Sequence, residues 1–156
     1  YQPPANAKVL FLVPQTRNKP FHKAPEMKKI RQLLRMIGED LASQIHVCVY
    51  AAPFGVIPLE LDEVYPLSQH EATLPLDIET INYVASQAAS YIKNNGYTGV
   101  VVLNDRKLWK DTVKTAVLAA CEEKSLYFAA QDTNVEGTRE MLNHLADALR
   151  KGLSSN

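Results

Sequence analysis

Four short runs of apolar residues alternate with longer stretches in which apolar residues recur every three or four positions. The apolar runs are 8–13, 45–50, 98–103 and 126–129. A continuous apolar run of this length is typical of a β-strand that is buried on both faces. The stretches after them, 25–37, 78–92, 105–120 and 135–149, have the spacing of amphipathic helices. The pattern therefore predicts the order β-α-β-α-β-α-β-α.

Residues at the ends of the predicted helices support these boundaries. Pro25 lies where a first helical turn begins, and Gly38 follows the last apolar position of the same helix. Asp77 is placed to cap the second helix, and Asn104 or Asp105 is placed to cap the third. We expect these helices to begin and end close to these residues.

Apolar strands that alternate with helices predict a mostly parallel sheet with helices on both faces, joined by right-handed crossovers. The expected fold class is α/β, a three-layer sandwich around a four-stranded sheet. In such a sheet the segments that leave the strands meet at one edge, where ligands bind. The segments expected at this edge are 14–25, 51–75, 104–106 and 130–136. The second is long and rich in proline, which is typical of functional loops.

The length of 156 residues and the apolar fraction of 46% suit one domain with one core. We assign residues 1–7 to a linker, 8–152 to a single α/β domain and 153–156 to a tail. Because the chain starts with Tyr1 and a proline-rich stretch, we expect it to be a fragment of a longer multidomain protein. No apolar run approaches the ~18 residues of a membrane helix, so we expect a soluble, cytoplasmic protein with no membrane partner.

The net charge of zero conceals a strong separation of charge along the chain. Residues 1–35 carry +7, residues 36–92 carry −8 and residues 93–156 carry +1. The basic band favours a surface that binds nucleic-acid phosphates. The alternative is that the basic and acidic bands face each other or lie on opposite solvated faces. The candidates for RNA binding are Arg17, Lys19, Lys23, Lys28 and Lys29.

Several common site types are disfavoured by the sequence. The loop after the first strand has no glycine to cradle a phosphate, and the chain contains neither GxGxxG nor GxxxxGK[ST]. The histidines lie in different elements, and no CxxC spacing is present, so we expect neither a metal site nor a cofactor. His46 is interpreted as a core or edge residue with satisfied hydrogen bonds, and Cys48 and Cys121 as buried thiols.

Acid–base chemistry has weak candidates in the proline-rich segment. Glu60 or Glu63 could act as a general base if one of them were desolvated in the crevice. The alternative is a short helical turn over 58–65 that begins at Pro58, with acidic residues stabilised by the helix dipole. Ser68 and His70 are interpreted as polar loop residues rather than a nucleophile and its base.

The segment 55–66 has the sequence GVIPLELDEVYP. It resembles the G-[VL]-[VI]-P-x-E-L-E-x-x-Y-P segment of a domain in archaeosine synthase and related archaeal tRNA-guanine transglycosylase-like proteins. In that family the domain follows a transglycosylase-like barrel and precedes a further small domain and a PUA domain. The resemblance covers residues 8–130 and implies the same alternation of strands and helices.

A second marker of the family follows the first strand. Archaeosine synthases carry Pro-Cys-Ser, two variable residues and Lys-Pro-Tyr, and then a serine and a histidine at fixed spacing. Pro14, Lys19 and Pro20 match this marker, Thr16 stands for the serine, and Phe21 replaces the tyrosine.

The reactive positions of the marker differ in this chain. Gln15 occupies the position of the cysteine, Ala24 that of the later serine and Met27 that of the histidine. Archaeosine synthase modifies 7-cyano-7-deazaguanine in the tRNA D-arm by adding an amine to the nitrile. The resemblance therefore implies a parent enzyme that acts on tRNA, with a domain here that lacks the reactive side chains.

Three functions follow from these observations. The first is a non-catalytic accessory module that helps to hold tRNA through the basic band. The second is a crevice that binds a base or an amine, or has catalytic activity, with Lys19 and Glu60 as weak catalytic candidates. The third is a structural spacer between other domains. The crevice candidates are Thr16, Lys19, Phe21, Gly55, Pro58, Glu60, Tyr65 and Asn104.

Overall fold

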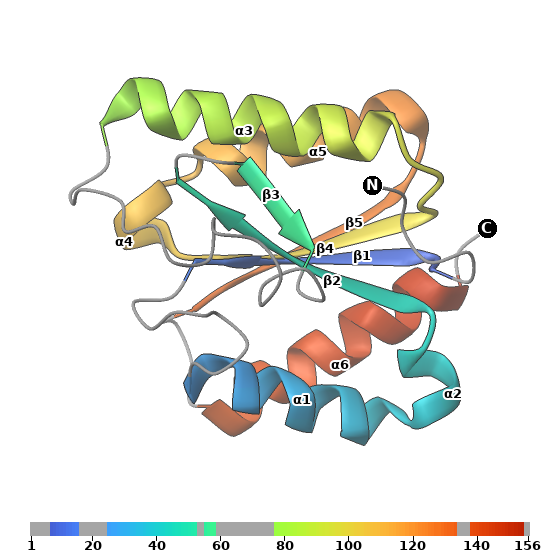
Figure 1. The fold of residues 1–156 in the computed structure, drawn as a ribbon. Helices are drawn as coiled ribbons and strands as arrows, with labels where there is room; N and C mark the ends of the chain where they lie inside the picture. The colour runs from blue at the N-terminus through green and yellow to red at the C-terminus, as the bar shows by residue number, and fades with distance from the viewer. Residues whose placement is uncertain (1–6, 16–24, 53–54, 59–76, 134–137, 155–156) are drawn as a thin grey trace.

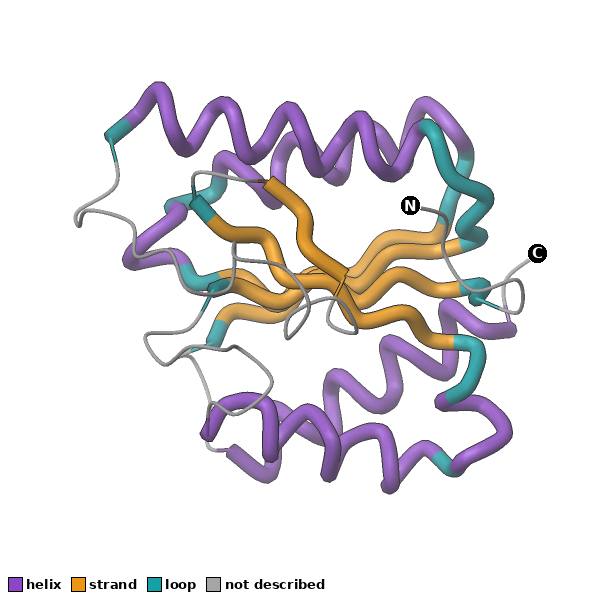
Figure 2. The backbone as a smooth tube through the Cα atoms, in the orientation of Figure 1, coloured by secondary structure: helices purple, strands orange, loops and turns teal. Residues whose placement is uncertain are grey.

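A mostly parallel β-sheet lies between two layers of helices (Figures 1 and 2). The computed structural model describes residues 7–15, 25–52, 55–58, 77–133 and 138–154. The strands are β1 (Val9–Pro14), β2 (Ile45–Ala51), β3 (Gly55–Pro58), β4 (Gly99–Asn104) and β5 (Tyr127–Asp132). The helices are α1 (Pro25–Ile37), α2 (Glu39–Ala42), α3 (Ile78–Lys93), α4 (Arg106–Trp109), α5 (Thr112–Lys124) and α6 (Thr138–Ser154).

The strand order in the sheet is β3-β2-β1-β4-β5. β1 pairs in parallel with β2 and β4, and β4 pairs in parallel with β5, so these four strands end at one edge. β3 is antiparallel to β2. Phe11 in the central strand lies opposite Val47 on one side and Val101 on the other. The α/β class and the four parallel strands confirm the expectation from the apolar runs.

Alternate residues of the strands build two separate cores. Val9, Phe11 and Val13 face α1 and α6, whereas Leu10 and Leu12 face α3 and α5. All five are 0–1% exposed, which explains why β1 is apolar on both faces. The sheet is thus covered on both faces in its centre.

The strand β3 corrects the sequence-based prediction of four strands. Gly55–Pro58 pairs with β2, from Ala51 opposite Gly55 to Cys48 opposite Pro58. Pro58 is therefore the last residue of a strand, and the expected helical turn over 58–65 otherwise lies outside the described residues. Pro58 is tolerated there because this strand lies at the edge of the described sheet, where a missing N–H breaks no inner ladder.

The predicted third helix is two helices in the structure. Asp105 caps α4, with its carboxylate accepting the Leu108 N–H at 3.3 Å, and this confirms one of the two expected caps. α4 ends after one turn at Lys110, whose φ of 54° lies in the left-handed region that non-glycine residues rarely adopt. α5 then starts at Thr112. Asp77 caps α3 as predicted, and the hydrogen bond from the Thr80 N–H holds the pKa of its carboxyl below its usual value.

His46 confirms its interpretation as a core residue with satisfied hydrogen bonds. Its side chain is 3% exposed, and Nδ1 shares a 2.7 Å hydrogen bond with the Tyr97 hydroxyl, which in turn lies 3.0 Å from the Tyr91 hydroxyl. Cys48 and Cys121 are buried and are not joined in a disulfide, and burial raises the pKa of Cys121 to about 11. These groups stabilise the α3 side of the sheet and lie away from solvent.

Gly55→Ala is expected to lower the free energy of unfolding by about 2 kcal/mol, because an L-residue is strained at positive φ. The φ of Gly55 is +103°, and an added Cβ would lie 2.8 Å from Gln87 Cβ on α3. Urea denaturation measures the change. The matched control is Gly96→Ala, where an added Cβ meets no atom within 4 Å. Equal stability of the two variants would contradict this role of Gly55.

Candidate functional site

The edge at which the four parallel strands end is the candidate site. The chain passes from β1 to β2 on one side and then crosses to β4 on the other, so the sheet has a topological switch point between β1 and β4. Ligands of open α/β sheets bind outside the strand ends at such a point. Figure 1 shows that α1, α3, α4 and α5 all begin at this edge.

Asn104, the last residue of β4, is the centre of a buried polar cluster at this edge. Its side chain is fully buried, and Nδ2 donates to the carboxylates of Asp132 at 3.2 Å and Asp111 at 3.4 Å. These two contacts fix the amide orientation, because the reverse orientation would turn the amide oxygen toward the carboxylates. In this orientation Asn104 Oδ1 is a buried acceptor that has no hydrogen-bond partner among the described residues.

Trp109 and Tyr50 lie beside this cluster, on the α3 side of the sheet. Their rings pack edge-to-face, with centroids 5.2 Å apart, and both side chains are fully buried. The Tyr50 hydroxyl donates to the Leu103 carbonyl at 2.7 Å, and burial raises the pKa of Tyr50 far above its usual value. Within the described part of the chain, Trp109 Nε1 has no acceptor. Among the described residues, Asn104 Oδ1 and Trp109 Nε1 are thus one buried acceptor and one buried donor without a hydrogen-bond partner.

Gln15, at the position of the family's cysteine, has a structural role at the end of β1. Its backbone N–H donates to the Tyr50 carbonyl at 3.0 Å, and its side-chain Oε1 accepts the Ala52 N–H at 2.7 Å. Both contacts join the end of β1 to the end of β2. An amide oxygen engaged in this way has no nucleophilic chemistry to offer.

The exposed face of α1 is strongly basic. Lys28, Lys29, Arg31 and Arg35 are all exposed, and residues 28–37 contain no acidic residue. Lys28, Arg31 and Arg35 are spaced by three and four positions and so follow one stripe of the helix. Within the described ranges, no ion pair involves Lys28, Lys29 or Arg35. We call these four side chains the α1 basic face.

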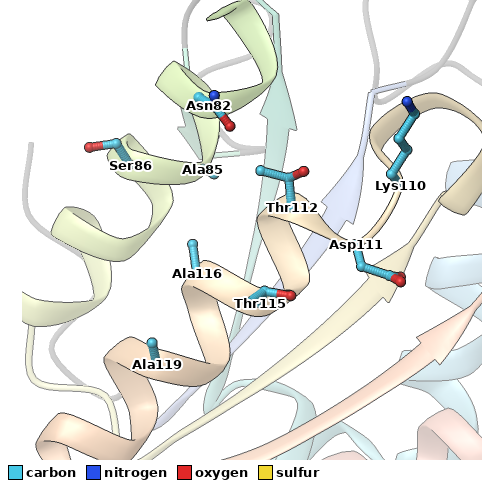
Figure 3. Close-up of a pocket in the computed structure, with 9 residues that line it drawn as sticks. All are labelled: Asn82, Ala85, Ser86, Lys110, Asp111, Thr112, Thr115, Ala116 and Ala119. Atoms are coloured by element: carbon cyan, nitrogen blue, oxygen red, sulfur yellow. The ribbon is translucent and has the colours of Figure 1, made fainter. Parts of the chain in front are cut away.

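An open groove of about 760 Å³ runs between α3 and the first turns of α5 (Figure 3). Its floor is formed by alanines of the two helices, among them Ala85 and Ala116. Polar side chains line its walls, and Lys110 lies at its mouth. The other polar lining residues are Asn82, Ser86, Asp111, Thr112 and Thr115.

Most of the predicted crevice and catalytic residues lie outside the described residues. This applies to the candidates of 16–24 and 59–76. The expected grouping of these side chains with Asn104 in one crevice, and the alternative that this crevice binds a base or an amine, stay predictions. The residues concerned are Thr16, Arg17, Lys19, Phe21, Lys23, Glu60, Glu63 and Tyr65.

The described candidates do not converge on one point. Gly55 reaches the carboxyl edge opposite Ala51, whereas Pro58 lies three residues back along β2, opposite Cys48. β2 and β1 separate β3 from β4, so Gly55 and Asn104 are three strand spacings, or about 14 Å, apart. Lys28 and Lys29 belong to the α1 basic face.

Sequence reasoning identified Asn104 but missed its partners. Asp111 and Asp132 come from α5 and from the end of β5, 7 and 28 residues away. A signal for Asp132 existed, since a carboxylate at the end of an apolar strand faces the same edge as Asn104. The position of Asp111 depends on the break between α4 and α5. No apolar pattern in the sequence marks that break.

No group of three or more potential metal ligands gathers in the part of the chain that the structure describes. Among the same residues, no helix is both long enough and apolar enough to cross a bilayer.

The comparisons with known proteins identify a family and a set of relatives. A family model described as "Domain of unknown function (DUF5591)" matches residues 1–149. The chain is 38% identical over 74 residues to the tRNA-guanine(15) transglycosylase of Saccharolobus solfataricus, an alignment that covers 46% of this chain and 15% of the relative. The corresponding protein of Methanosphaera stadtmanae is 31% identical over 102 residues, which cover 61% of this chain and 15% of the relative.

These alignments confirm the resemblance to archaeal tRNA-guanine transglycosylases that the two sequence markers indicated. They span about 15% of the length of these curated relatives. A solved structure, "Crystal structure of AF0587, a protein of unknown function", superposes with a TM-score of 0.62 at 16% identity. That superposition covers 100% of this chain and 47% of the other, and it establishes the fold alone.

Proposed function

The chain belongs to the DUF5591 family, and on that premise we propose that it is an accessory, non-catalytic domain that positions tRNA. The parent would be a cytoplasmic tRNA-modification protein of the archaeosine (7-deazaguanine) pathway. The relatives that support this proposal are named tRNA-guanine(15) transglycosylases. The observation that carries it is the α1 basic face.

The α1 basic face suits an RNA backbone for reasons of charge and geometry. It presents four exposed cations on a helix of 13 residues whose inner side, including Ile30 and Leu33, is anchored in the core. At 1.5 Å rise per residue, the stripe from Lys28 to Arg35 extends about 10 Å. A rigid row of cations of this length can contact successive phosphates of one strand, and such contacts position a protein without reading sequence.

The non-catalytic part of the proposal is supported by the chemistry at the strand ends. Gln15 uses its side-chain oxygen to hold the Ala52 N–H and carries no thiol. Cys48 and Cys121 are buried, and desolvation raises the pKa of the Cys121 thiol, which disfavours the thiolate needed for attack. The described carboxyl edge therefore supplies hydrogen bonds and charge, and no activated nucleophile.

Reversing two charges of the α1 basic face is expected to weaken tRNA binding by the full-length protein. The variant is Lys28→Glu/Lys29→Glu, which changes exposed side chains only. We expect affinity for an unmodified tRNA transcript to fall about tenfold, and the log–log slope of affinity against salt to decrease by about two, one for each lost phosphate contact. Filter binding at several salt concentrations measures both quantities.

The control is a double variant that changes the net charge by the same amount at the opposite edge of the sheet. Lys8 precedes β1 and Lys124 ends α5, and both side chains are exposed. The double variant Lys8→Glu/Lys124→Glu should keep the slope of the unmodified protein. If Lys28→Glu/Lys29→Glu has the slope of this control, the α1 basic face has no role in tRNA binding.

A further inference from the structure

A second group of cations lies at the same edge of the sheet, in the other helix layer. The connection from α4 into α5 carries four basic residues between positions 106 and 114, and Asp111 is the acidic residue among them. We define the α4–α5 corner as Lys107, Lys110 and Lys114. Lys107 and Lys110 are exposed and Lys114 is half-buried.

The nearby acids are already engaged within the protein. Asp111 accepts from Asn104 Nδ2 at 3.4 Å and lies 3.7 Å from Arg106 Nη2, so it offsets the charge of Arg106. The carboxylate of Asp105 accepts the Leu108 N–H at 3.3 Å. In the described ranges, by contrast, no ion pair joins an acid to any of the three lysines of the corner. Among the described residues, their charges are therefore not offset by an ion pair.

The backbone holds the corner in a fixed shape. Lys110 adopts φ 54° and ψ −136°, and its N–H donates to the Arg106 carbonyl at 3.0 Å. Trp109, the residue before it, is fully buried and anchors the turn against Tyr50. Figure 3 shows the Lys110 side chain extending away from the side chain of Asp111. The Lys110 side chain thus projects from a turn whose inner side is anchored in the core.

The groove beside the corner favours RNA over a protein partner. Its polar lining offers hydroxyl and amide groups from Asn82, Ser86 and Thr112, which are groups that contact phosphates and ribose hydroxyls. The Asp111 carboxylate also lines the groove, where Asn104 and Arg106 contact it. Its apolar lining is alanine, whereas protein interfaces are centred on aromatic, methionine or arginine anchors. Lysines in turn bind phosphates as flexible point charges.

We propose that the α4–α5 corner is a second tRNA-backbone contact, across the sheet edge from the α1 basic face. This inference rests on the proposed function, because it takes the same partner. Figure 1 shows α4 and the start of α1 at one edge, in opposite layers of the sandwich. A nucleic acid that lies across this edge meets Lys28 and Lys29 on one side and Lys107 and Lys110 on the other.

The test is the variant Lys107→Glu/Lys110→Glu in the full-length protein, bound to an unmodified tRNA transcript over a range of salt concentrations. We expect an affinity loss of about tenfold and a salt slope smaller by about two. Both changes should exceed those of Lys8→Glu/Lys124→Glu. The variant Lys107→Gln/Lys110→Gln, which removes charge without reversing it, should give the same decrease in slope with a smaller loss of affinity. Unchanged thermal denaturation of each variant establishes that the fold is retained.

The outcomes separate this inference from the proposed function. A slope equal to that of the Lys8→Glu/Lys124→Glu control overturns the inference, and that is also the result expected if the corner binds an acidic protein surface. If Lys28→Glu/Lys29→Glu then still lowers the slope, the proposed function stands without the second contact. If Lys107→Glu/Lys110→Glu lowers the salt slope and Lys28→Glu/Lys29→Glu does not, the α4–α5 corner is the tRNA contact and the α1 basic face is not.

Discussion

Trp109→Ala is expected to lower the free energy of unfolding by about 4 kcal/mol, a typical loss for removing a buried aromatic side chain. Trp109 is fully buried between the sheet and α3, packs edge-to-face on Tyr50, and is the anchor of the turn into α5. Its loss leaves a cavity at the point where the Asn104 cluster is positioned. Urea denaturation followed by circular dichroism measures the change, since Trp109 is the single tryptophan of the chain.

The matched control keeps an aromatic ring and removes only the indole N–H. Because Trp109 Nε1 has no acceptor in the described part of the chain, Trp109→Phe gives up no hydrogen bond there. We expect it to lower the free energy of unfolding by less than about 2 kcal/mol, the loss due to the smaller ring. An equal loss in the two variants would show that the ring volume is not what stabilises this turn.

Asn104→Asp is expected to destabilise the fold by more than about 3 kcal/mol at neutral pH, because it buries a third carboxylate against two others. The Asn104 amide now donates to Asp111 at 3.4 Å and Asp132 at 3.2 Å. In the variant, the amide NH₂ group that donates to both carboxylates is replaced by a carboxylate oxygen, which only accepts. Asn104→Ala, which removes the donors without adding charge, should lose about 2 kcal/mol.

The pH dependence distinguishes the charge effect from a loss of packing. The introduced carboxyl would have a raised pKa in the folded state, compared with about 3.9 when unfolded. Its penalty is therefore absent below the unfolded pKa and grows as pH rises toward the folded pKa. The stability difference between Asn104→Asp and Asn104→Ala should close in acid and open toward neutrality. A difference that stays constant with pH would contradict this account of the cluster.

Three of the four strands that the sequence predicts are buried almost throughout, whereas β5 is only partly buried. β1, β2 and β4 are apolar on both faces because helices cover both sides of the sheet, so continuous apolar runs mark them. The same reasoning does not predict β3. It has four residues, begins with a glycine at positive φ, ends with a proline and pairs with β2 as a sequence-local hairpin, so it has no continuous apolar run to mark it.

The candidate site is predictable to a smaller extent, for a related reason. Asn104 is the last residue of a strand that is otherwise apolar, and topology alone places it at the ligand edge. Its partners Asp111 and Asp132 depend on where α5 starts and how far β5 extends. Lys107 and Lys110 belong to a stretch of near-neutral overall charge, and the sequence does not show that Asp111 contacts Asn104 and Arg106 rather than these lysines.

The most direct measurement is the salt dependence of tRNA binding by this chain alone, compared with Lys28→Glu/Lys29→Glu at two salt concentrations. We predict that the chain binds an unmodified tRNA transcript and that this binding weakens steeply with salt. In the variant, the log–log slope of affinity against salt should be smaller by about two. Binding with the same slope in both proteins, or no binding by either, would contradict the claim that the α1 basic face holds tRNA.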